Sequence, residues 1–451
     1  MFDLPEEAAN DGAARSTQGI GRPRVQCVNR EQIVFRAVAL DDLVASDHEV
    51  RAIWAYVGGM NLDSLYQPIL AIEQRPGRPP IDPKILMALW LYATVDGVGS
   101  ARELDRLCRD HVHYQWICGD VRVNYHTLSD FRTDHGDLLD ELLTKSVATL
   151  IQEGLVHLNQ VAQDGMRVRA SAGSSSFRRR PTLESCLKEA REQVAALKEE
   201  LESDPAAGTK RRQAARERAA RERAQRVEKA LEELAALEPK MAARKKGSQE
   251  KARGSTTDPE ARRMKMGDGG FRPAFNVQFA TTVHSQVIVG VDVVNIGSDG
   301  GQMLPMVEQI EKRYDETPQE YLVDGGFATV EDIDAVGGPD HGATVYAPVK
   351  DEEKKQKAGV DPFAPRCKDS AVVGAWRVRM GTDEAKAIYK NRASTAECVN
   401  AQARNRGLQQ FRVRGLLKAR AVALWYALAH NIIRSIALLR AAKSQIAPMG
   451  V

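Results

Sequence analysis

The chain has 451 residues, with 64 lysines and arginines against 61 aspartates and glutamates, so its formal net charge is only +3. This length predicts two to four structural units, and a content of 43% hydrophobic residues is enough to bury a core in each, which excludes a disordered chain. Six cysteines are too few for a disulfide scaffold and are typical of a reducing compartment.

We expect neither a membrane span nor a signal peptide. The most apolar stretch, residues 421–442, is interrupted by His430, Asn431 and Arg434, whereas a span needs about 18 to 20 apolar residues. Residues 1–10 include acidic side chains and lack the apolar segment of a signal peptide. The sequence therefore favours a cytoplasmic protein. The near-neutral net charge says nothing about how charge is distributed along the chain, so it does not argue against a nucleic-acid partner.

The first third of the chain predicts a flexible arm followed by a helical domain. Residues 1–30 are polar and punctuated by glycine and proline. Residues 31–150 show helical periodicity, with a start signal at Asp82-Pro83 and a capping box from Ser100 to Glu103. The result is an all-α N-terminal domain built of short helices.

Two features of this domain have a functional and a structural interpretation. A helix that begins near Thr127 presents Arg132 to DNA if it acts as the second helix of a helix-turn-helix, and packs in the core if it does not. Cysteines and histidines at 108, 111, 113 and 118 have a spacing that is not standard for a structural zinc site, so core packing is favoured over metal binding.

The middle of the chain combines a strand with a helical hairpin. Residues 156–162 predict a strand that leads to Asp164-Gly165. Residues 181–253 then predict an inserted, coiled-coil-like hairpin with a heptad seam in its first arm. Residues 184–204 carry 7 acidic and 3 basic side chains, and residues 210–229 carry 9 basic and 3 acidic ones. Either the two arms pair with each other or the basic arm faces DNA.

The remaining segments predict a mixed sheet with helices on its faces. If the hairpin is set aside, the element order from residue 155 to 442 is β–β–β–α–β–α–β–α, which is typical of a mixed α/β sheet. The expected strands after the hairpin are 274–282, 286–294, 321–323 and 344–348, the expected helices are 302–314, 331–335, 385–404 and 421–439, and a long loop is expected over 350–368.

Three acidic residues stand out by their positions relative to these elements. Asp164 and Asp324 follow predicted strands, at the edge where open α/β sheets form their sites, and Glu397 lies in a later helix. Converging carboxylates suit hard divalent cations such as Mg²⁺, and two such ions serve phosphodiester chemistry. Taken singly, each aspartate is more typical of a turn or a cap. Four other aspartates compete for the same role, with Asp299 as the best alternative: Asp292, Asp299, Asp332 and Asp334.

Several stretches around these carboxylates match a known family. The matching stretches are Gln163-Asp-Gly-Met166, Ser255-Thr-Thr-Asp-Pro259, Gly269-Gly-Phe-Arg-Pro-Ala-Phe-Asn-Val-Gln278, Leu322-Val-Asp-Gly-Gly-Phe327 and Tyr389-Lys-Asn-Arg392-Ala-Ser-Thr-Ala-Glu397. On these residues the chain resembles bacterial insertion-sequence transposases of the DDE superfamily, closest to the IS1182 group within the wider IS4/IS5-like set, and the resemblance extends over about residues 38–440.

The resemblance implies an RNase H-like core in which Asp164, Asp324 and Glu397 are the catalytic, metal-binding triad. The implied cofactor is Mg²⁺, with Mn²⁺ as a substitute. Tyr389 and Arg392 match the family's Tyr/Arg/Glu signature, and an arginine stands at position 404, where members usually have lysine. We expect Tyr389, Arg392, Arg404 and Arg132 to contact DNA.

The surroundings of Glu397 support that expectation. Residues 386–420 contain nine lysines and arginines and one acid, Glu397 itself. On a regular α-helix Arg404 shares the face of Glu397, whereas Tyr389 and Arg392 lie progressively further round. Arg404 therefore either holds a DNA phosphate or pairs with the carboxylate, and the charge bias favours the phosphate.

The implied activity is that of a homodimeric transposase on bacterial nucleoid DNA. It binds terminal inverted repeats, cleaves at the element ends and joins the freed 3′-hydroxyl to target DNA, with residues 31–150 helping to bind the ends and pair the subunits. Neither a small-molecule substrate nor a nucleotide cofactor is implied. Two alternatives stay open, namely an RNase H-like nuclease that does not transfer strands and an inactive, domesticated DNA-binding protein.

Overall fold

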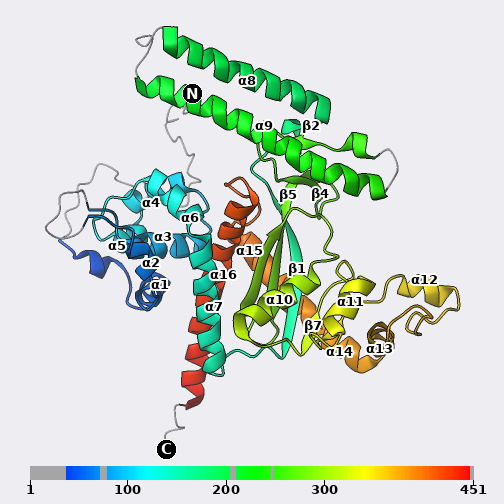
Figure 1. The fold of residues 1–451 in the computed structure, drawn as a ribbon. Helices are drawn as coiled ribbons and strands as arrows, with labels where there is room; N and C mark the ends of the chain where they lie inside the picture. Colours follow the sequence, from blue (N-terminus) through cyan, green and yellow to red (C-terminus); the bar gives the residue numbers. More distant parts are fainter. Residues whose placement is uncertain (1–36, 72–78, 204–209, 245–247, 447–451) are drawn as a thin grey trace, which may run out of the picture.

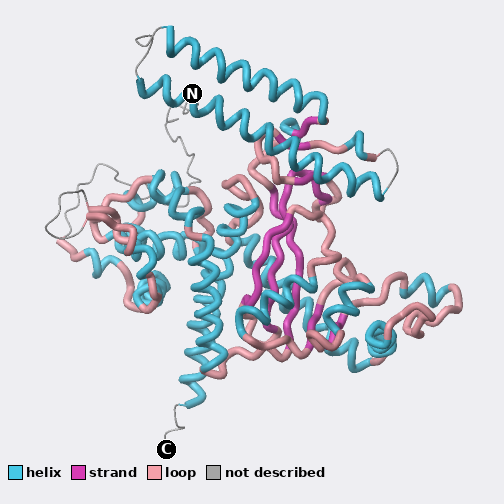
Figure 2. The backbone as a smooth tube through the Cα atoms, viewed as in Figure 1, coloured by secondary structure: helices cyan, strands magenta, loops and turns pink. Residues whose placement is uncertain are grey.

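The computed structural model describes residues 37–71, 79–203, 210–244 and 248–446. The arm expected over residues 1–30 lies outside them. The described chain has three regions: a group of helices, a mixed sheet with flanking helices, and a long helical hairpin (Figures 1 and 2). Helices dominate, and the α/β class with a mixed sheet is confirmed.

Helices alone make up the described chain before the sheet. Asp82 caps the most buried of them, α3, by accepting a hydrogen bond from the Lys84 backbone N–H, and Pro83 lies in its first turn. The other expected cap, Ser100, accepts from the Glu103 N–H at the start of α4. The helices are η1 (Leu40–Leu43), α1 (Glu49–Gly58), α2 (Asp63–Tyr66), α3 (Pro83–Val95), α4 (Ala101–Asp110), α5 (Val112–Cys118), α6 (Tyr125–Asp134) and α7 (Gly136–Gln152).

The sheet has β1 near its centre. β1 (Gln160–Arg169) pairs antiparallel with β5 (Phe271–Thr282) on one side and parallel with β7 (Glu320–Leu322) on the other. β7 is parallel to β8 (Thr344–Tyr346), which forms one edge. Successive parts of β5 pair antiparallel with β4 (Arg262–Lys265) and β6 (Ile288–Val294) along the other edge.

The connections place helices between and after the strands. They are α10 (Met303–Tyr314), α11 (Val330–Gly337), α12 (Glu352–Lys357), α13 (Ala371–Met380), α14 (Asp383–Arg392), the π turn η4 (Ala393–Glu397), α15 (Cys398–Asn405) and α16 (Leu416–Ile446). The long loop expected over residues 350–368 is therefore interrupted by a short helix, and α13 was not expected at all.

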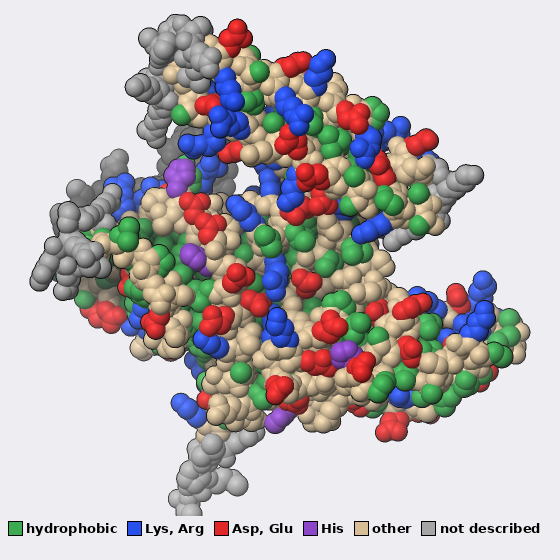
Figure 3. Space-filling model, in the orientation of Figure 1, with side chains coloured by type: hydrophobic (Ala, Val, Ile, Leu, Met, Phe, Trp, Pro, Cys, Tyr) green, Lys and Arg blue, Asp and Glu red, His purple; other side chains and the backbone are tan. Residues whose placement is uncertain are grey.

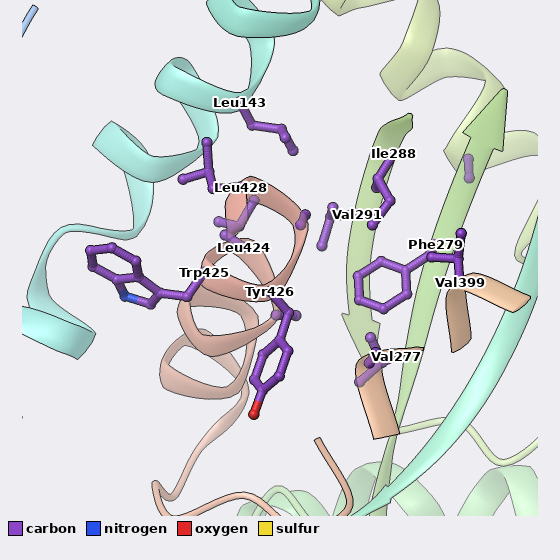
Figure 4. Close-up of a cluster of buried hydrophobic side chains, with 14 of the residues drawn as sticks. Leu143, Val277, Phe279, Ile288, Val291, Val399, Leu424, Trp425, Tyr426 and Leu428 are labelled. Atoms are coloured by element: carbon purple, nitrogen blue, oxygen red, sulfur yellow. The ribbon is translucent and has the colours of Figure 1, made fainter. Parts of the chain in front are cut away.

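One helix, α16, joins the N-terminal helices to the sheet. It packs beside α7 (Figure 1), and its Leu424 and Leu428 face Phe279 of β5 and Val291 of β6 in the core (Figure 4). By length and composition alone it could cross a bilayer, but 67% of its apolar window is buried inside the structure, and a buried core helix meets the same criteria.

The polar residues that interrupt this apolar helix explain its place in the core. Asn431 donates to the backbone carbonyl of Ile288 and accepts from its N–H, both at 2.8 Å. His430 donates to the carbonyl of Gln286 at 2.7 Å, and Arg434 to that of Ser285 at 2.9 Å. The three side chains thereby satisfy the backbone where β6 begins.

The hairpin consists of α8 (Arg180–Ser203) and α9 (Lys210–Arg244), and it has a small core of its own. Its base is a short ladder between β2 (Phe177–Arg178) and β3 (Gly254–Ser255), flanked by η2 (Ser174–Ser176) and η3 (Gln249–Lys251). Oppositely charged side chains alternate over its surface (Figure 3). The ion pairs between the arms include Arg180–Glu238, Arg191–Glu228 and Arg216–Glu200, which favours self-pairing over a basic arm that faces DNA.

Candidate active site

The two aspartates of the predicted triad lie side by side on adjacent parallel strands. Asp324 follows the end of β7, whereas Asp164 lies inside β1, which continues to Arg169, so the strand end expected at residue 162 is wrong. Ala162 of β1 is opposite Leu322 of β7, so Asp164 and Asp324, each two residues further along, lie at the same level. Glu397 comes from the π turn, which packs against β1 and β5. The fold therefore brings the three acidic residues together from three separate segments of the chain.

Arg392 lies at the centre of this group. Its guanidinium Nη1 is 2.9 Å from Glu397 Oε1, and its Nη2 is 3.3 Å from Asp164 Oδ1 and 3.9 Å from Asp324 Oδ2. The residue is 7% exposed. Both Nη atoms point at carboxylates, and the Nε has no partner among the described residues but is buried. Arg392 therefore presents no exposed cation to a DNA phosphate in this structure, and the expectation that it contacts DNA is not supported.

A π turn creates this arrangement. Residues 383–405 form the expected helix, but the turn Ala393–Glu397 holds one residue more than an α-helical turn. On a regular α-helix Arg392 and Glu397 would point about 140° apart. The extra residue brings the two side chains onto one face, and this corrects the geometry expected from the sequence.

Asp164 is the most buried of the three carboxylates, with 16% of its side chain exposed against 39% for Asp324 and 57% for Glu397. Burial raises its pKa, an effect that Arg392 opposes and the Asp324 charge reinforces. Hydrogen bonds from Asn400 Nδ2 at 2.9 Å and from the Gly165 N–H also favour the ionised form.

Asn400 is a site residue that the sequence analysis missed. Its side chain is 3% exposed, and its Oδ1 is buried without a hydrogen-bond partner among the described residues. It lies three residues after Glu397 in α15, a spacing that puts both on one helix face. That spacing is the signal that was available in the sequence.

The other expected DNA-contacting residues lie in different surroundings. Tyr389 is half-buried beside the carboxylates; burial raises its pKa, and Arg392 opposes the shift. Arg404 is exposed at the end of α15, without an ion pair to the described residues. Arg404 therefore offers a free cation to a phosphate, whereas Tyr389 is half-buried beside the carboxylates.

Arg132 is buried in the helical region and is not available to DNA in this structure. Only 5% of it is exposed, and its guanidinium carbon lies 4.6 Å from the centre of the Trp90 ring. It donates a hydrogen bond to the carbonyl of Gly99, and burial lowers its pKa to about 10. The expectation that it faces DNA is corrected in favour of helix packing.

The carboxylate of Asp299, the best alternative acid, is already bound by three other side chains. It pairs with Arg167 at 2.6 Å and accepts hydrogen bonds from Asn276 at 2.7 Å and Gln278 at 3.0 Å. A Cβ atom on Gly165 would lie 2.3 Å from its Oδ1, so glycine is required after Asp164. Asp299 therefore acts as a structural support.

The remaining alternatives also have structural partners. Asp332 lies in the first turn of α11 and accepts one hydrogen bond, from the backbone N–H of Gly301. Asp334 accepts from Ser370, and Asp292 lies 3.8 Å from Arg420. None of the three belongs to the group around Arg392.

The carboxylate oxygens of the triad are the type of donor that hard divalent cations prefer. Three hard oxygen donors already surround one positive group, the Arg392 guanidinium. Among the described residues no three histidine, cysteine, aspartate or glutamate side chains meet closely enough to hold a metal as arranged. A metal ion and the guanidinium would thus compete for the same carboxylates. In the segment 108–118, Cys118 is buried in the core and Cys108 packs against it, as the core-packing interpretation expects.

Two family models match the chain. Residues 38–134 match a "Transposase domain (DUF772)", and residues 365–436 match a "Transposase DDE domain". No curated protein and no solved structure matches. The first segment covers the N-terminal helices up to Arg132, and the second contains Arg392, Glu397 and Asn400. The chain thus carries two domains that support a DDE transposase of an insertion sequence, and the IS1182 group is consistent with both.

Proposed function

We propose that this transposase binds the terminal inverted repeats of its element, cleaves DNA at the element ends and joins the freed 3′-hydroxyl to target DNA. The observation that carries the proposal is the convergence of Asp164, Asp324 and Glu397 on one guanidinium, with the two aspartates level on adjacent parallel strands. Grouped carboxylates on a mixed sheet are the donors that phosphodiester cleavage by divalent cations requires.

In this proposal Asp164, Asp324 and Glu397 hold the divalent cation, Mg²⁺ with Mn²⁺ as a substitute. When bound, such a cation activates a nucleophilic oxygen and stabilises the leaving oxygen. Asn400 orients Asp164 through its 2.9 Å hydrogen bond. Arg392 balances the carboxylate charges before the cation binds.

Exposed cations beyond the triad supply the contacts to phosphates. Arg404 lies two turns after Glu397 and is free to bind a phosphate near the reacting bond. The neighbouring segment adds further exposed cations: Lys390, Arg412, Arg414 and Lys418. Because each neutralised phosphate releases counterions, binding of duplex DNA weakens steeply with added salt.

For the rest of the protein we propose the domain organisation that the family resemblance implies. Residues 155–442 form an RNase H-like catalytic domain into which the hairpin of 181–253 is inserted. Residues 31–150 help to bind the element ends and to pair two subunits, and the homodimer acts on nucleoid DNA in the cytoplasm. The strand order and the parallel β1–β7–β8 arrangement support this fold.

The test compares cleavage and binding for Asp324→Asn on DNA that carries the element ends. The variant loses strand cleavage, because an amide is a poor ligand for the cation, and keeps inverted-repeat binding. Asp340→Asn removes an exposed carboxylate outside the site and should leave both unchanged. Undiminished cleavage by Asp324→Asn would sink the assignment.

Strand joining separates the proposal from its alternatives. With a pre-cleaved end and a target plasmid, a transposase joins the two, whereas a nuclease does not. A domesticated DNA-binding protein neither cleaves nor joins. The presence of all three carboxylates at one site argues against a DNA-binding protein without activity, and strand joining distinguishes the transposase from the nuclease.

A further inference from the structure

A cationic groove lies between the hairpin and the edge of the sheet. Its cavity of about 910 Å³ is bounded by the second half of α9, the segment from η3 to Arg253, the start of β5 and the loop at residues 295–298. The groove is distinct from the carboxylate site, and neither matched family segment includes it.

Nearly all of the charged side chains that line the groove are positive. Six cations line it against one acid, Glu233, which pairs with Arg262. The other five cations are exposed and have no ion pair with any residue that the structure describes: Arg179, Lys240, Lys251, Arg253 and Arg263. Elsewhere on the hairpin, arginines such as Arg191 and Arg216 are matched by glutamates of the opposite arm. Five unpaired cations thus gather in the groove around one acid that is already paired, and such a cluster suits a polyanion.

The groove also exposes apolar surface among its cations. Phe271, at the start of β5, is 58% exposed, and Ile296 is 41% exposed. The α9 side adds Leu237 and Met241. A duplex keeps the faces of its bases stacked inside and offers only phosphates and base edges, whereas an unpaired strand offers base faces as well. Cations interleaved with an aromatic platform are the features that bind a single strand.

The loop that lines the groove leads directly to the carboxylates. Arg167 of β1 donates to the carbonyl of Gly297 at 3.0 Å and pairs with Asp299. At Gly300 an added Cβ would lie 3.7 Å from the carbonyl of Gly326, two residues after Asp324. Since a chain spans at most about 3.6 Å per residue, the groove end at Ser298 lies within about 20 Å of Asp324.

We propose that this groove binds a single strand of DNA, with phosphates on Lys251 and Arg253 and a base stacked on Phe271. The proposal rests on the proposed function for the source of the strand, which is the unpaired DNA adjoining the cleaved element end. The hairpin then acts as one wall of a channel that guides this strand away from the carboxylates.

The test measures binding of the full-length protein to a fluorescently labelled oligothymidine, which forms no duplex, by fluorescence anisotropy at several salt concentrations. Lys251→Gln/Arg253→Gln should weaken binding at least tenfold and lower the salt slope by about 1.4, since each single-strand phosphate contributes about 0.7. Phe271→Leu should weaken it about fivefold or more, with the salt slope unchanged, because only stacking is lost. The matched control, Lys198→Gln/Arg212→Gln, removes two exposed cations near the opposite end of the hairpin and should leave binding unchanged.

Two results overturn the proposal: an equal loss in the control pair, which means that any cation contributes, or unchanged binding in both groove variants. Circular dichroism of each variant separates misfolding from loss of the groove, and Phe271→Tyr, which keeps the ring, should retain binding. Because the readout is binding of oligothymidine, it is independent of cleavage. A protein that cuts nothing but loses oligothymidine binding in the groove variants would keep this inference and overturn the proposed function instead.

Discussion

Arg392 and Glu397 lie five residues apart in sequence and pair at 2.9 Å across a single π turn. The same guanidinium reaches Asp164, so it connects the helix to the middle of β1. π turns are rare and occur frequently at functional sites. Here the turn places a permanent positive charge where the carboxylates would hold a cation, and Arg392 thus keeps the triad assembled when no metal is bound.

The first prediction concerns Arg392→Gln. Without metal, the change leaves the buried Asp164 carboxylate uncompensated, and unfolding should cost about 3 kcal/mol less than in the unmodified protein. Added Mn²⁺ should restore this stability, because the cation takes the place of the lost guanidinium. The measurement is the thermal unfolding midpoint of each protein with and without Mn²⁺.

Arg377→Gln is the matched control for that experiment. Arg377 is also a buried arginine, and it pairs with Asp369 at 2.6 Å outside the site. Its loss should lower the unfolding midpoint too, but Mn²⁺ should not restore it. An equal Mn²⁺ effect on both variants would contradict the role given to Arg392.

The second prediction concerns Asn400→Ala. Because Asn400 orients Asp164 by a 2.9 Å hydrogen bond, its loss should lower cleavage about 10- to 100-fold and raise the metal concentration needed for half-maximal rate. Gln402→Ala, on the same helix but bonded to Cys398, is the control and should cleave normally. Normal metal dependence in Asn400→Ala would argue against a positioning role.

The site was predictable in part, because Asp164 and Asp324 follow runs that are typical of strands and parallel strands bring such positions close together. The bounds of the first strand were wrong, since β1 begins at Gln160 and continues past Asp164 to Arg169. The register that makes them level, Ala162 opposite Leu322, depends on pairing between segments 160 residues apart in sequence and leaves no local signal. The π turn was missed for a related reason, since one inserted residue changes the face of Glu397 without changing the composition.

Arg132 shows the same limit for the helical region. Its sequence neighbours allow either a surface helix or a packed one, and the ring that covers its guanidinium, Trp90, belongs to another helix. The cluster of unpaired cations in the groove was likewise invisible, because its members come from separate segments, from Arg179 before α8 to Arg263 in β4, that only the fold brings together. Long-range pairing decides all of these features.

The third prediction follows from the burial of His430. Burial lowers its pKa to about 4, so the folded protein keeps it neutral, with Nε2 donating to the Gln286 carbonyl. Its folded pKa lies below the unfolded value of about 6.5, so its contribution to stability is present above that value and is lost as the pH falls toward 4. Between pH 7 and 5 the loss should be about 2 kcal/mol.

His430→Gln keeps an N–H donor but does not titrate, so this part of the pH dependence should disappear. Urea unfolding monitored by tryptophan fluorescence at the two pH values measures it. His284→Gln, which removes an exposed histidine of the same region, should retain the dependence of the unmodified protein. If His430→Gln also retains it, another group titrates.

The fourth prediction is that Asp258→Asn stabilises the protein at neutral pH, although Asp258 belongs to one of the stretches that resemble the transposase family. Its side chain is buried, its Oδ1 accepts from the Gly415 N–H at 3.2 Å, and its Oδ2 has no partner among the described residues. Burial raises its pKa to about 6. A folded pKa above the unfolded value means that the stabilising contribution is present below about 4 and is lost as the pH rises through 6.

Asparagine keeps the acceptor for Gly415 and removes the charge that folding must bury above pH 6. Raising the pKa of Asp258 to about 6 on folding corresponds to about 3 kcal/mol of lost stability at neutral pH. The amide group of the asparagine, which has no hydrogen-bond partner, offsets part of this, so we expect a gain of about 1 to 2 kcal/mol at pH 7.5. At pH 5 the carboxyl of the unmodified protein is largely protonated and the gain should vanish. Urea unfolding at both pH values is the measurement, with Asp340→Asn as the exposed control; a loss of stability at pH 7.5 would mean that the Asp258 charge itself stabilises the turn before β4.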